Sequence, residues 1–265
     1  MEEIKTAGLV IRELQVGEAD KLLTILTPEH GKLCVSGKGV ASLRSRHMTS
    51  AQPFSYSSFV LRRTRKYYYI ADSDMIECFF NIRYDIERLA LANYLCDVAC
   101  DVALEDSDES ELLRLMLNTL YALSNRENIS NELLRAAFEF RVAVQSGYMP
   151  QLDDCEVCGK HMPPMPLLFD VMNGSLRCSD CANVARRAEM DEDRTADITF
   201  RLTPAVLETM RYIARAPLGR YLSFSLSQDE LPLFSGISET YLTSHLEHGF
   251  GSLTYYKKLC RDGAV

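Results

Sequence analysis

Features that mark several protein classes are absent from this sequence of 265 residues. It contains no run of 18 consecutive apolar residues, so a membrane-spanning helix is not expected. Residues 1–3 begin neither a basic region nor an apolar run, so we expect no export signal and a cytosolic location. Also missing are a glycine-rich phosphate loop of the Walker or Rossmann form and a recognisable Ser-His-Asp spacing. The sequence therefore shows no sign of these nucleotide-binding or serine-hydrolase classes.

Acidic residues are missing from one long segment. The whole chain has a formal net charge of −8, yet no Asp or Glu occurs between His30 and Ala71. The Lys and Arg residues of this segment are Lys32, Lys38, Arg44, Arg46, Arg62, Arg63, Arg65 and Lys66. A basic segment inside an acidic protein is typical of a surface that binds a polyanion. We therefore expect one side of the protein to bind nucleic acid and the acidic remainder to serve a different partner.

Residues 4–77 have the pattern of short β-strands. Segments rich in β-formers, separated by Gly, Pro and charged turns, occur at residues 9–12, 22–27, 32–35, 54–61 and 67–70. Five short strands favour a small closed barrel or sandwich, and a five-stranded oligonucleotide-binding (OB) barrel fits that number. Its binding face would use a loop over residues 37–46 and a turn over residues 62–66. The predicted phosphate-binding residues are Lys38, Arg44, Arg46, Arg62, Arg63, Arg65 and Lys66.

Three consecutive tyrosines follow the second basic segment. Tyr67, Tyr68 and Tyr69 are available to stack on bases, which is how many proteins hold single strands. Each is equally a strand residue whose side chain belongs to the barrel core. The basic segments likewise have a plain alternative, a solvated face with no ligand.

From Phe79 onward the apolar residues follow a helical period. The predicted helical faces span residues 91–102, 113–120 and 133–144. Thr203-Pro204 is typical of a helix start, with a capping side chain and proline at the first helical position. A last helical stretch over residues 237–259 is expected to break at Gly249 and Gly251. Such apolar faces are typical of a helix-bundle core rather than of a cofactor site.

Four of the nine cysteines form two Cys-x-x-Cys pairs that are 19 residues apart, Cys155 with Cys158 and Cys178 with Cys181. Two tight turns with this spacing can offer four thiolates to one tetrahedral ion, which is typical of a zinc ribbon. Gly159 suits a turn with positive φ, and Asn173-Gly174 suits a hairpin between the pairs. Paired spacing disfavours the alternative of four ordinary buried or disulfide-bonded cysteines. We predict one structural Zn²⁺ per chain.

The predicted zinc is interpreted as structural because four thiolates close the coordination shell and leave no position for water. Zinc deaminases place His-x-Glu before their cysteines, whereas the only His-x-Glu here, at residues 245–247, follows them. His161 is a competing ligand, although a solvated turn histidine is the simpler interpretation. The remaining cysteines are expected to be small buried residues, namely Cys34, Cys78, Cys96, Cys100 and Cys260.

Several short motifs occur in a fixed order. They are residues 17–27 (Gly-Glu-Ala-Asp-Lys-Leu-Leu-Thr-Ile-Leu-Thr), His30-Gly31-Lys32, Lys38-Gly39, Gln52-Pro53-Phe54 and the four paired cysteines. Over nearly the whole chain this order resembles the RecO family of bacterial DNA repair and recombination mediators. The resemblance implies an α+β multidomain fold, in which an N-terminal five-stranded OB-fold β-barrel precedes an α-helical domain with an inserted zinc ribbon. The expected boundaries are 1–78 for the barrel, 79–150 with 184–265 for the helical domain, and 151–183 for the ribbon.

The resemblance also implies a function. Members of the family are non-enzymatic proteins of the RecF pathway that bind single- and double-stranded DNA and anneal complementary strands. With RecR they help RecA replace single-strand-binding protein. The implied partners are therefore DNA, RecR and the acidic, hydrophobic C-terminal tail of single-strand-binding protein, with RecA reached indirectly and no membrane. The implied location is cytoplasmic and nucleoid-associated.

Two other functional classes are alternatives when the residues are considered without the resemblance. A zinc-dependent hydrolase or deaminase would need an open coordination position and a general base beside the metal. An OB-fold RNA-binding or transcription-linked adaptor with structural zinc would use the same barrel, because stacking and charge do not read the sugar.

Overall fold

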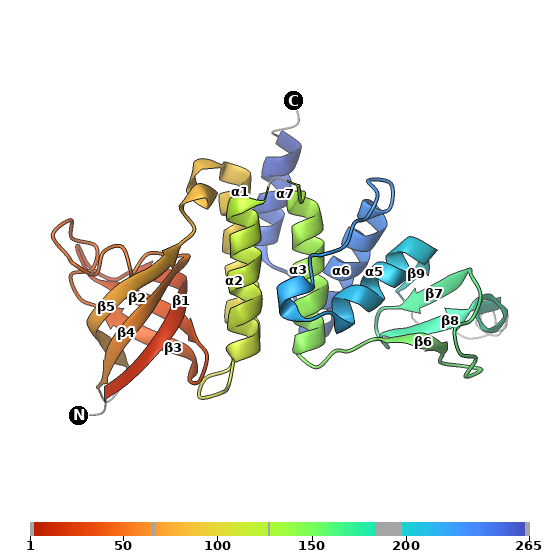
Figure 1. The fold of residues 1–265 in the computed structure, drawn as a ribbon, viewed down its shortest axis with the longest axis horizontal. Helices are drawn as coiled ribbons and strands as arrows, with labels where there is room; N and C mark the ends of the chain where they lie inside the picture. Colours follow the sequence, from red (N-terminus) through yellow and green to blue (C-terminus); the bar gives the residue numbers. More distant parts are fainter. Residues whose placement is uncertain (1–2, 65–66, 127, 184–197, 263–265) are drawn as a thin grey trace. The chain divides into compact units, whose positions relative to one another are not determined.

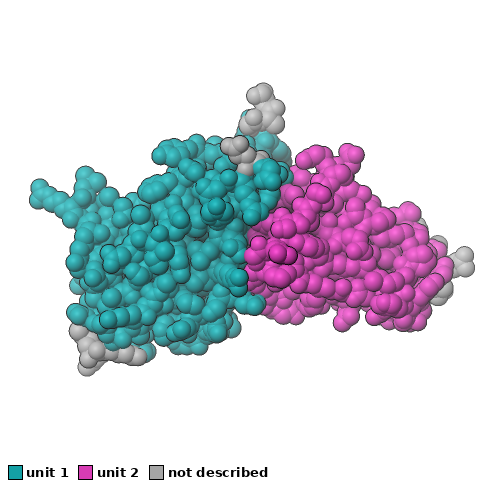
Figure 2. All heavy atoms as spheres, viewed as in Figure 1, with its two compact units in different colours: residues 1–131, 250–265 teal, residues 132–249 magenta. Residues whose placement is uncertain are grey.

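The computed structural model describes residues 3–64, 67–126, 128–183 and 198–262 (Figure 1). The chain forms two compact units (Figure 2). Unit 1 comprises residues 1–131 and 250–265, and unit 2 comprises residues 132–249. Among the described residues, no helix is both long and apolar enough to cross a lipid bilayer.

Unit 1 begins with a closed barrel in the order β1-β2-β3-β5-β4. Its strands are β1 (Glu3–Gln15), β2 (Lys21–Thr27), β3 (Gly31–Gly37), β4 (Ser55–Arg63) and β5 (Tyr68–Cys78). All neighbouring strands are antiparallel except β3 and β5, which run parallel. A Greek-key barrel of five strands is the architecture of the OB fold, so the predicted fold class of this part is confirmed.

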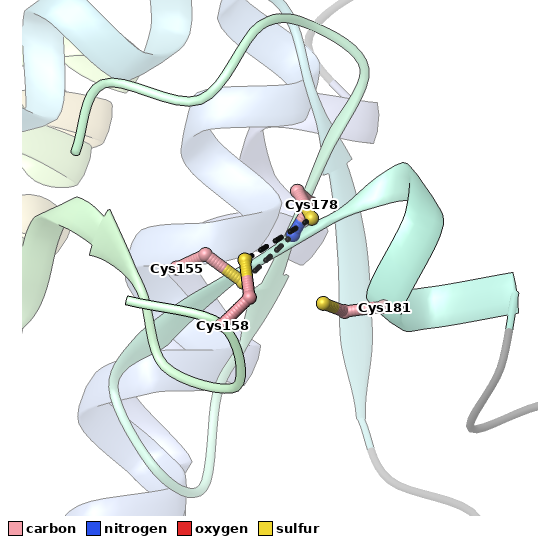
Figure 3. A group of neighbouring side chains, drawn as sticks. All are labelled: Cys155, Cys158, Cys178 and Cys181. Carbon is pink, nitrogen blue, oxygen red and sulfur yellow. Dashed lines mark hydrogen bonds between the residues drawn. The ribbon is translucent and has the colours of Figure 1, made fainter. Parts of the chain in front are cut away.

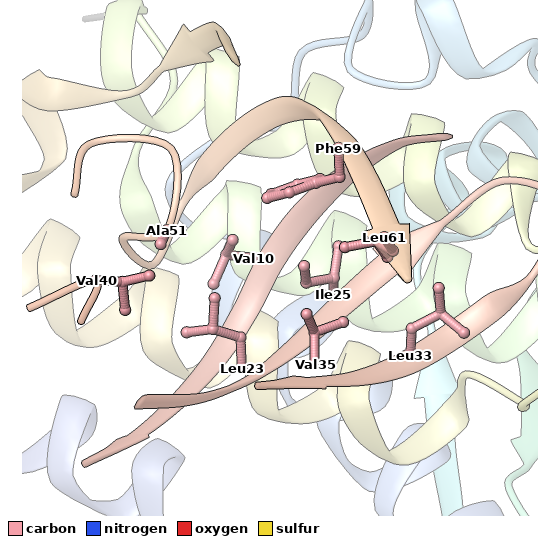
Figure 4. Packing of buried hydrophobic residues seen from close by; sticks show 9 residues of the cluster. All are labelled: Val10, Leu23, Ile25, Leu33, Val35, Val40, Ala51, Phe59 and Leu61. Atoms are coloured by element: carbon pink, nitrogen blue, oxygen red, sulfur yellow. The ribbon is translucent and has the colours of Figure 1, made fainter. Parts of the chain in front are cut away.

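Alternating side chains fill the barrel (Figure 4). Leu23 and Ile25 on β2 point inward, and so do Leu33 and Val35 on β3. Because successive residues of a strand face opposite sides, Cys34 between them is exposed. The prediction that all five remaining cysteines are buried is therefore wrong for Cys34 and holds in full only for Cys96, since Cys78, Cys100 and Cys260 are partly exposed.

Strand β1 departs from simple alternation, because Leu9, Val10 and Ile11 are all buried. Val10 belongs to the barrel core. Helix α1 (Ile86–Val102) packs against β1, so both faces of this strand are covered. A two-residue pattern in the sequence could not reveal this second covering layer.

Three helices complete unit 1, namely α1, α2 (Ser110–Asn125) and α7 (Gly251–Asp262), after a short 3₁₀ turn over Phe80–Tyr84. The Asp85 side chain caps α1 by accepting hydrogen bonds from the N–H groups of Glu87 and Arg88. Helix α1 packs against both α2 and α7. The rings of Tyr94 and Phe250 meet edge to face, with their centroids 5.7 Å apart. The last helix of the chain thus packs on the first.

The described elements of unit 2 include the helices α3 (Asn131–Gln145), α5 (Pro204–Arg215) and α6 (Leu231–Leu246) and a four-stranded sheet. The Thr203 hydroxyl caps α5 by accepting a hydrogen bond from the Val206 N–H at 3.3 Å, which confirms the predicted start. The predicted break near Gly249 is also confirmed, since α6 ends at Leu246 and α7 begins at Gly251.

The sheet of unit 2 has the order β6-β8-β7-β9. The strands are β6 (Gln151–Cys155), β7 (Leu167–Asp170), β8 (Ser175–Cys178) and β9 (Thr199–Leu202). Strands β7 and β8 form the predicted hairpin, with Gly174 at φ +59°. Strand β9 was not predicted from the sequence, because four residues with a single buried side chain carry too short a pattern.

A buried ionic cluster joins α3 to α6 inside unit 2. The Arg135 side chain is almost fully buried, and its Nη1 atom donates to Glu139 Oε1 at 2.7 Å and to Glu239 Oε2 at 3.0 Å. Its Nη2 atom donates to the Ser235 hydroxyl at 2.6 Å. Glu139 has no solvent exposure. Charges removed from water in this way depend on their partners, so the cluster is sensitive to the loss of either one.

Candidate functional site

The four paired cysteines lie together in unit 2 (Figure 3). Their Sγ atoms all lie within 4.8 Å of one another. The Sγ atoms of Cys158 and Cys178 are 3.9 Å apart. A tetrahedral ion with bonds of about 2.3 Å places its sulfur ligands about 3.8 Å apart, so the cluster has the size of a zinc-thiolate site. These four residues could hold a metal ion.

Local backbone geometry brings the first pair together. The N–H of Gly159 donates to the Cys155 carbonyl at 2.9 Å, and Gly159 has φ +67°, as its place after the pair predicted. The Cys178 N–H donates to the Cys155 sulfur at 3.4 Å. Strand pairing of β6 with β8 places Cys155 beside the end of the hairpin that carries the second pair.

The electrostatics of the cluster favour at least one thiolate. Burial opposes the ionisation of Cys155, but backbone N–H groups of Cys158, Cys178 and Val157 outweigh it and lower the pKa of Cys155 to about 6. Hydrogen bonding to Cys178, followed by burial, raises the pKa of Cys181 to about 12. Four neighbouring sulfurs cannot all ionise without a cation, whereas a divalent ion would hold all four as thiolates.

His161, the competing ligand, lies outside this cluster. Its Nδ1 atom is 2.7 Å from Asp154 Oδ1, and the side chain is exposed. The four sulfurs form a complete tetrahedral donor set without it. A metal bound here would have no open position for substrate or water.

The first basic segment lies on the connection between β3 and β4 and carries three exposed side chains, those of Lys38, Arg44 and Arg46. Hydrogen bonds tie this connection to the turn between β1 and β2. The Gly39 N–H donates to Asp20 Oδ1 at 2.7 Å, and the Ala41 N–H donates to the Ala19 carbonyl at 3.0 Å. The loop is therefore held in place by the barrel.

The second basic segment is the hairpin between β4 and β5. Arg62 and Arg63 are exposed at the end of β4, while the predicted residues Arg65 and Lys66 lie outside the described residues. The guanidinium carbon of Arg63 is 5.8 Å from the centroid of the Tyr68 ring, within cation–π range.

The three tyrosines of this hairpin differ in exposure. Tyr67 is 41% exposed. Tyr68 packs partly against the barrel core, and Tyr69 is half-buried. Tyr67 thus has the most accessible ring of the three for stacking.

Acidic residues from outside the acid-free segment neutralise two of the arginines. Arg46 Nη2 is 3.3 Å from Asp72 Oδ1, and Arg62 Nε donates to Glu3 Oε2 at 2.9 Å. The hydrogen bond to Glu3, and after it one to Tyr69, raises the pKa of Arg62. Residues 1–79 carry eleven basic and nine acidic side chains, a net charge of only +2.

Two described cations of the first basic segment, Lys38 and Arg44, remain available to contact a polyanion. In the part of the chain that the structure describes, neither Lys38 nor Arg44 forms an ion pair within 4.0 Å. Sequence reasoning missed the acidic partners of Arg46 and Arg62, because Glu3 pairs through strand register and Asp72 through loop packing. Of the first basic segment, Lys38 and Arg44 therefore carry the charge that is most available to a polyanion.

Both basic segments border the first part of β5. Arg62 is opposite Tyr69 in the β4–β5 register. Two residues further along β5, the Ala71 carbonyl accepts a hydrogen bond from Arg46 at 3.4 Å. Two residues of strand span about 7 Å, so segments distant in the sequence meet along one strand.

Comparisons with known proteins place this arrangement in a family. The chain matches the family model for the recombination protein O N terminal over residues 1–79, and that for the recombination protein O C terminal over residues 83–254. It is 31% identical over 261 residues to the DNA repair protein RecO of Acetivibrio thermocellus, covering 98% of this chain and 99% of that protein. It is also 31% identical over 258 residues to the DNA repair protein RecO of Alkaliphilus metalliredigens, covering 97% and 99%. The chain, with its OB barrel, helices and four-cysteine cluster, therefore belongs to the RecO family.

Proposed function

We propose that this protein acts in DNA repair as a recombination mediator. In this role it binds single- and double-stranded DNA, anneals complementary strands and, with RecR, helps load RecA onto DNA coated with single-strand-binding protein. The observation that carries the proposal is an OB barrel with two basic segments along β5, in a chain that belongs to the RecO family. The relatives named as DNA repair proteins cover almost the whole chain, which supports the repair role.

The proposed role needs no catalytic site. We infer that the cysteine cluster holds one structural Zn²⁺ through Cys155, Cys158, Cys178 and Cys181. When bound, zinc would cross-link the β7–β8 hairpin to β6 and stabilise the sheet. A hydrolase or deaminase would need an open coordination position, which a complete thiolate set does not leave. The proposed location is the cytoplasm, in association with the nucleoid.

Salt dependence tests the assignment of the DNA-contacting cations. We expect Lys38→Ala combined with Arg44→Ala to reduce the slope of log affinity against log salt for a single strand by about 1.4, because each lost phosphate contact removes about 0.7. Arg46→Ala should have a smaller effect, since Arg46 already pairs with Asp72. Affinity should fall by a similar factor for every sequence, because phosphate contacts carry no sequence information. Fluorescence anisotropy on a fixed-length oligonucleotide measures both quantities.

The matched control removes two exposed arginines outside the barrel, Arg114→Ala on helix α2 with Arg126→Ala at the residue after it, and should leave the slope unchanged. An equal loss of slope in both double variants would mean that net charge alone is responsible. An unchanged slope in the Lys38 and Arg44 variant would remove this loop from the proposed interface.

The sugar and the partners need separate measurements. The barrel's charge and rings do not read the sugar, so they fit a DNA repair mediator and an RNA-binding adaptor equally well. Competition between single-stranded DNA and RNA of equal length distinguishes the two. We propose RecR and the C-terminal tail of single-strand-binding protein as protein partners. Pull-down with each, with and without DNA, checks this, and capture of neither would contradict the mediator role.

The domain boundaries 1–78, 79–150 with 184–265, and 151–183 remain a prediction. The barrel's own core supports the first boundary. A fragment of residues 1–78 should fold with a β-type circular dichroism spectrum and bind DNA more weakly than the whole chain. It should also be less stable, because the Lys32 N–H would lose its bond to the Leu104 carbonyl. An unfolded fragment would move the boundary beyond the first helices.

A further inference from the structure

A small polar cavity lies beside β3 in unit 1. Its volume is about 160 Å³, and its walls come from β3, the β4–β5 hairpin and the connection between α1 and α2. The charged and aromatic groups among its lining residues are Lys32, Arg63, Tyr67, Tyr68, Glu105 and Asp106. Pockets for drug-sized ligands have volumes of about 300–1,000 Å³, so this cavity suits a smaller chemical group.

The acidic wall is held on the barrel by the backbone. The Lys32 N–H donates to the Leu104 carbonyl at 2.9 Å, and the Glu109 N–H donates to the Pro28 carbonyl at 2.7 Å. Gly31 has φ +63°, and a Cβ atom there would be 2.1 Å from the Leu104 carbonyl oxygen, so only glycine allows this close approach. Glu105, the residue after Leu104, is thereby fixed next to β3.

The β4–β5 hairpin contributes a cation and an exposed ring to the lining. The Arg63 guanidinium lies over the Tyr68 ring, and Tyr67 is 41% exposed. The hairpin that presents them is closed by the Thr64 N–H, which donates to the Tyr67 carbonyl at 2.9 Å. The amine of Lys32, another lining residue, donates to the Cys100 carbonyl at 2.8 Å. The cavity therefore combines hydrogen-bond donors, carboxylate acceptors and a stacking surface.

This combination selects among the parts of a nucleic acid. A phosphate is disfavoured, because Glu105 and Asp106 would repel it at short range. A nucleobase of a single strand can stack on Tyr67 and present its Watson–Crick edge to the carboxylates. Among the four bases, guanine has two adjacent donors on that edge, N1–H and the 2-amino group, which match one carboxylate, and its O6 atom can accept from a cation.

We propose that this cavity binds one guanine base of a single strand, with Glu105 accepting from the base, Arg63 donating to O6 and Tyr67 stacking on the ring. The proposal rests on the proposed DNA-binding function and adds a base preference to it. Phosphate contacts at Lys38 and Arg44 carry no sequence information, so a preference for guanine would come from the cavity.

Oligonucleotides that differ at one base test the proposal. An oligo(dT) strand with one central guanine should bind about tenfold more tightly than the same strand with hypoxanthine, which lacks the 2-amino donor, because a hydrogen bond to a charged group is lost. Glu105→Gln should abolish this difference while leaving the affinity for plain oligo(dT) within about twofold, measured by fluorescence anisotropy. The matched control is Glu111→Gln, the same charge change on the exposed first turn of α2, which should keep the difference.

The possible outcomes distinguish failure of the guanine site from failure of DNA binding as a whole. Tight binding of oligo(dT) with equal affinity for guanine and hypoxanthine would overturn the cavity assignment and leave DNA binding in place. A guanine preference that survives Glu105→Gln would overturn the role of Glu105 and with it the proposal. Failure to bind any oligonucleotide would overturn both this inference and the proposed function.

Discussion

Replacing Cys158 by Ser should abolish binding of the proposed zinc and unfold the four-stranded sheet of unit 2. The Cys158 sulfur lies 3.9 Å from that of Cys178, and the cluster would hold a metal ion at the edge of a sheet whose strands have only four or five residues. Apparent binding free energies of structural zinc in small peptides are about 10–16 kcal/mol, so losing one ligand removes a large part of the local stability. Elemental analysis should show one zinc per wild-type chain and clearly less than one in the variant.

The control for this experiment is Cys34→Ser, which removes an exposed thiol outside the cluster and should retain the full zinc content. Hydrogen exchange of residues 151–178 should rise only in the Cys158 variant or after treatment with a chelator. A freshly purified wild-type protein that is folded but free of metal would contradict the assignment. So would a Cys158 variant that still holds one zinc.

Replacing Arg135 by Met should destabilise unit 2 by about 3–5 kcal/mol. The substitution keeps most of the side-chain volume but leaves Glu139, which has no solvent exposure, without its closest cation. The cost comes from removing a cation from a buried carboxylate, so Arg135→Met combined with Glu139→Leu should recover much of the stability. Hydrogen exchange of α3 peptides at increasing urea concentrations measures this within unit 2.

Arg201→Met makes the same chemical change at an exposed position of β9 and should alter the stability of unit 2 by less than about 0.5 kcal/mol. If the Arg135 and Arg201 variants were equally stable, the buried cluster would contribute little. If the double variant were less stable than Arg135→Met alone, packing rather than the loss of the buried ion pair would explain the destabilisation.

Elements with a strong local pattern were predictable. The barrel strands follow from alternation, as in Leu33, Cys34 and Val35, and the start of α5 follows from Thr203-Pro204. The cysteine cluster follows from spacing alone, because two Cys-x-x-Cys turns position their own sulfurs. Weak local patterns failed, as in the four residues of β9, which become a strand only by pairing with β7.

The electrostatics of the barrel show where prediction from sequence stops. The acid-free segment suggested a strongly basic surface, but Asp72 and Glu3 pair with Arg46 and Arg62. Neither contact leaves a local signal, since Glu3 is 59 residues from its partner. A charge count over residues 30–71 leaves out Asp72 and Glu3, although both form ion pairs with arginines of that segment.

The sequence by itself therefore determined the OB barrel, the helices and the four-cysteine cluster, because each has a strong local pattern, namely strand alternation, the helical period and the Cys-x-x-Cys spacing. Only the tertiary structure decided which cations remain available, why both faces of β1 are buried and where Glu105 meets the barrel. These features depend on strand register and on packing between distant segments. Short-range backbone preferences do not encode either of them.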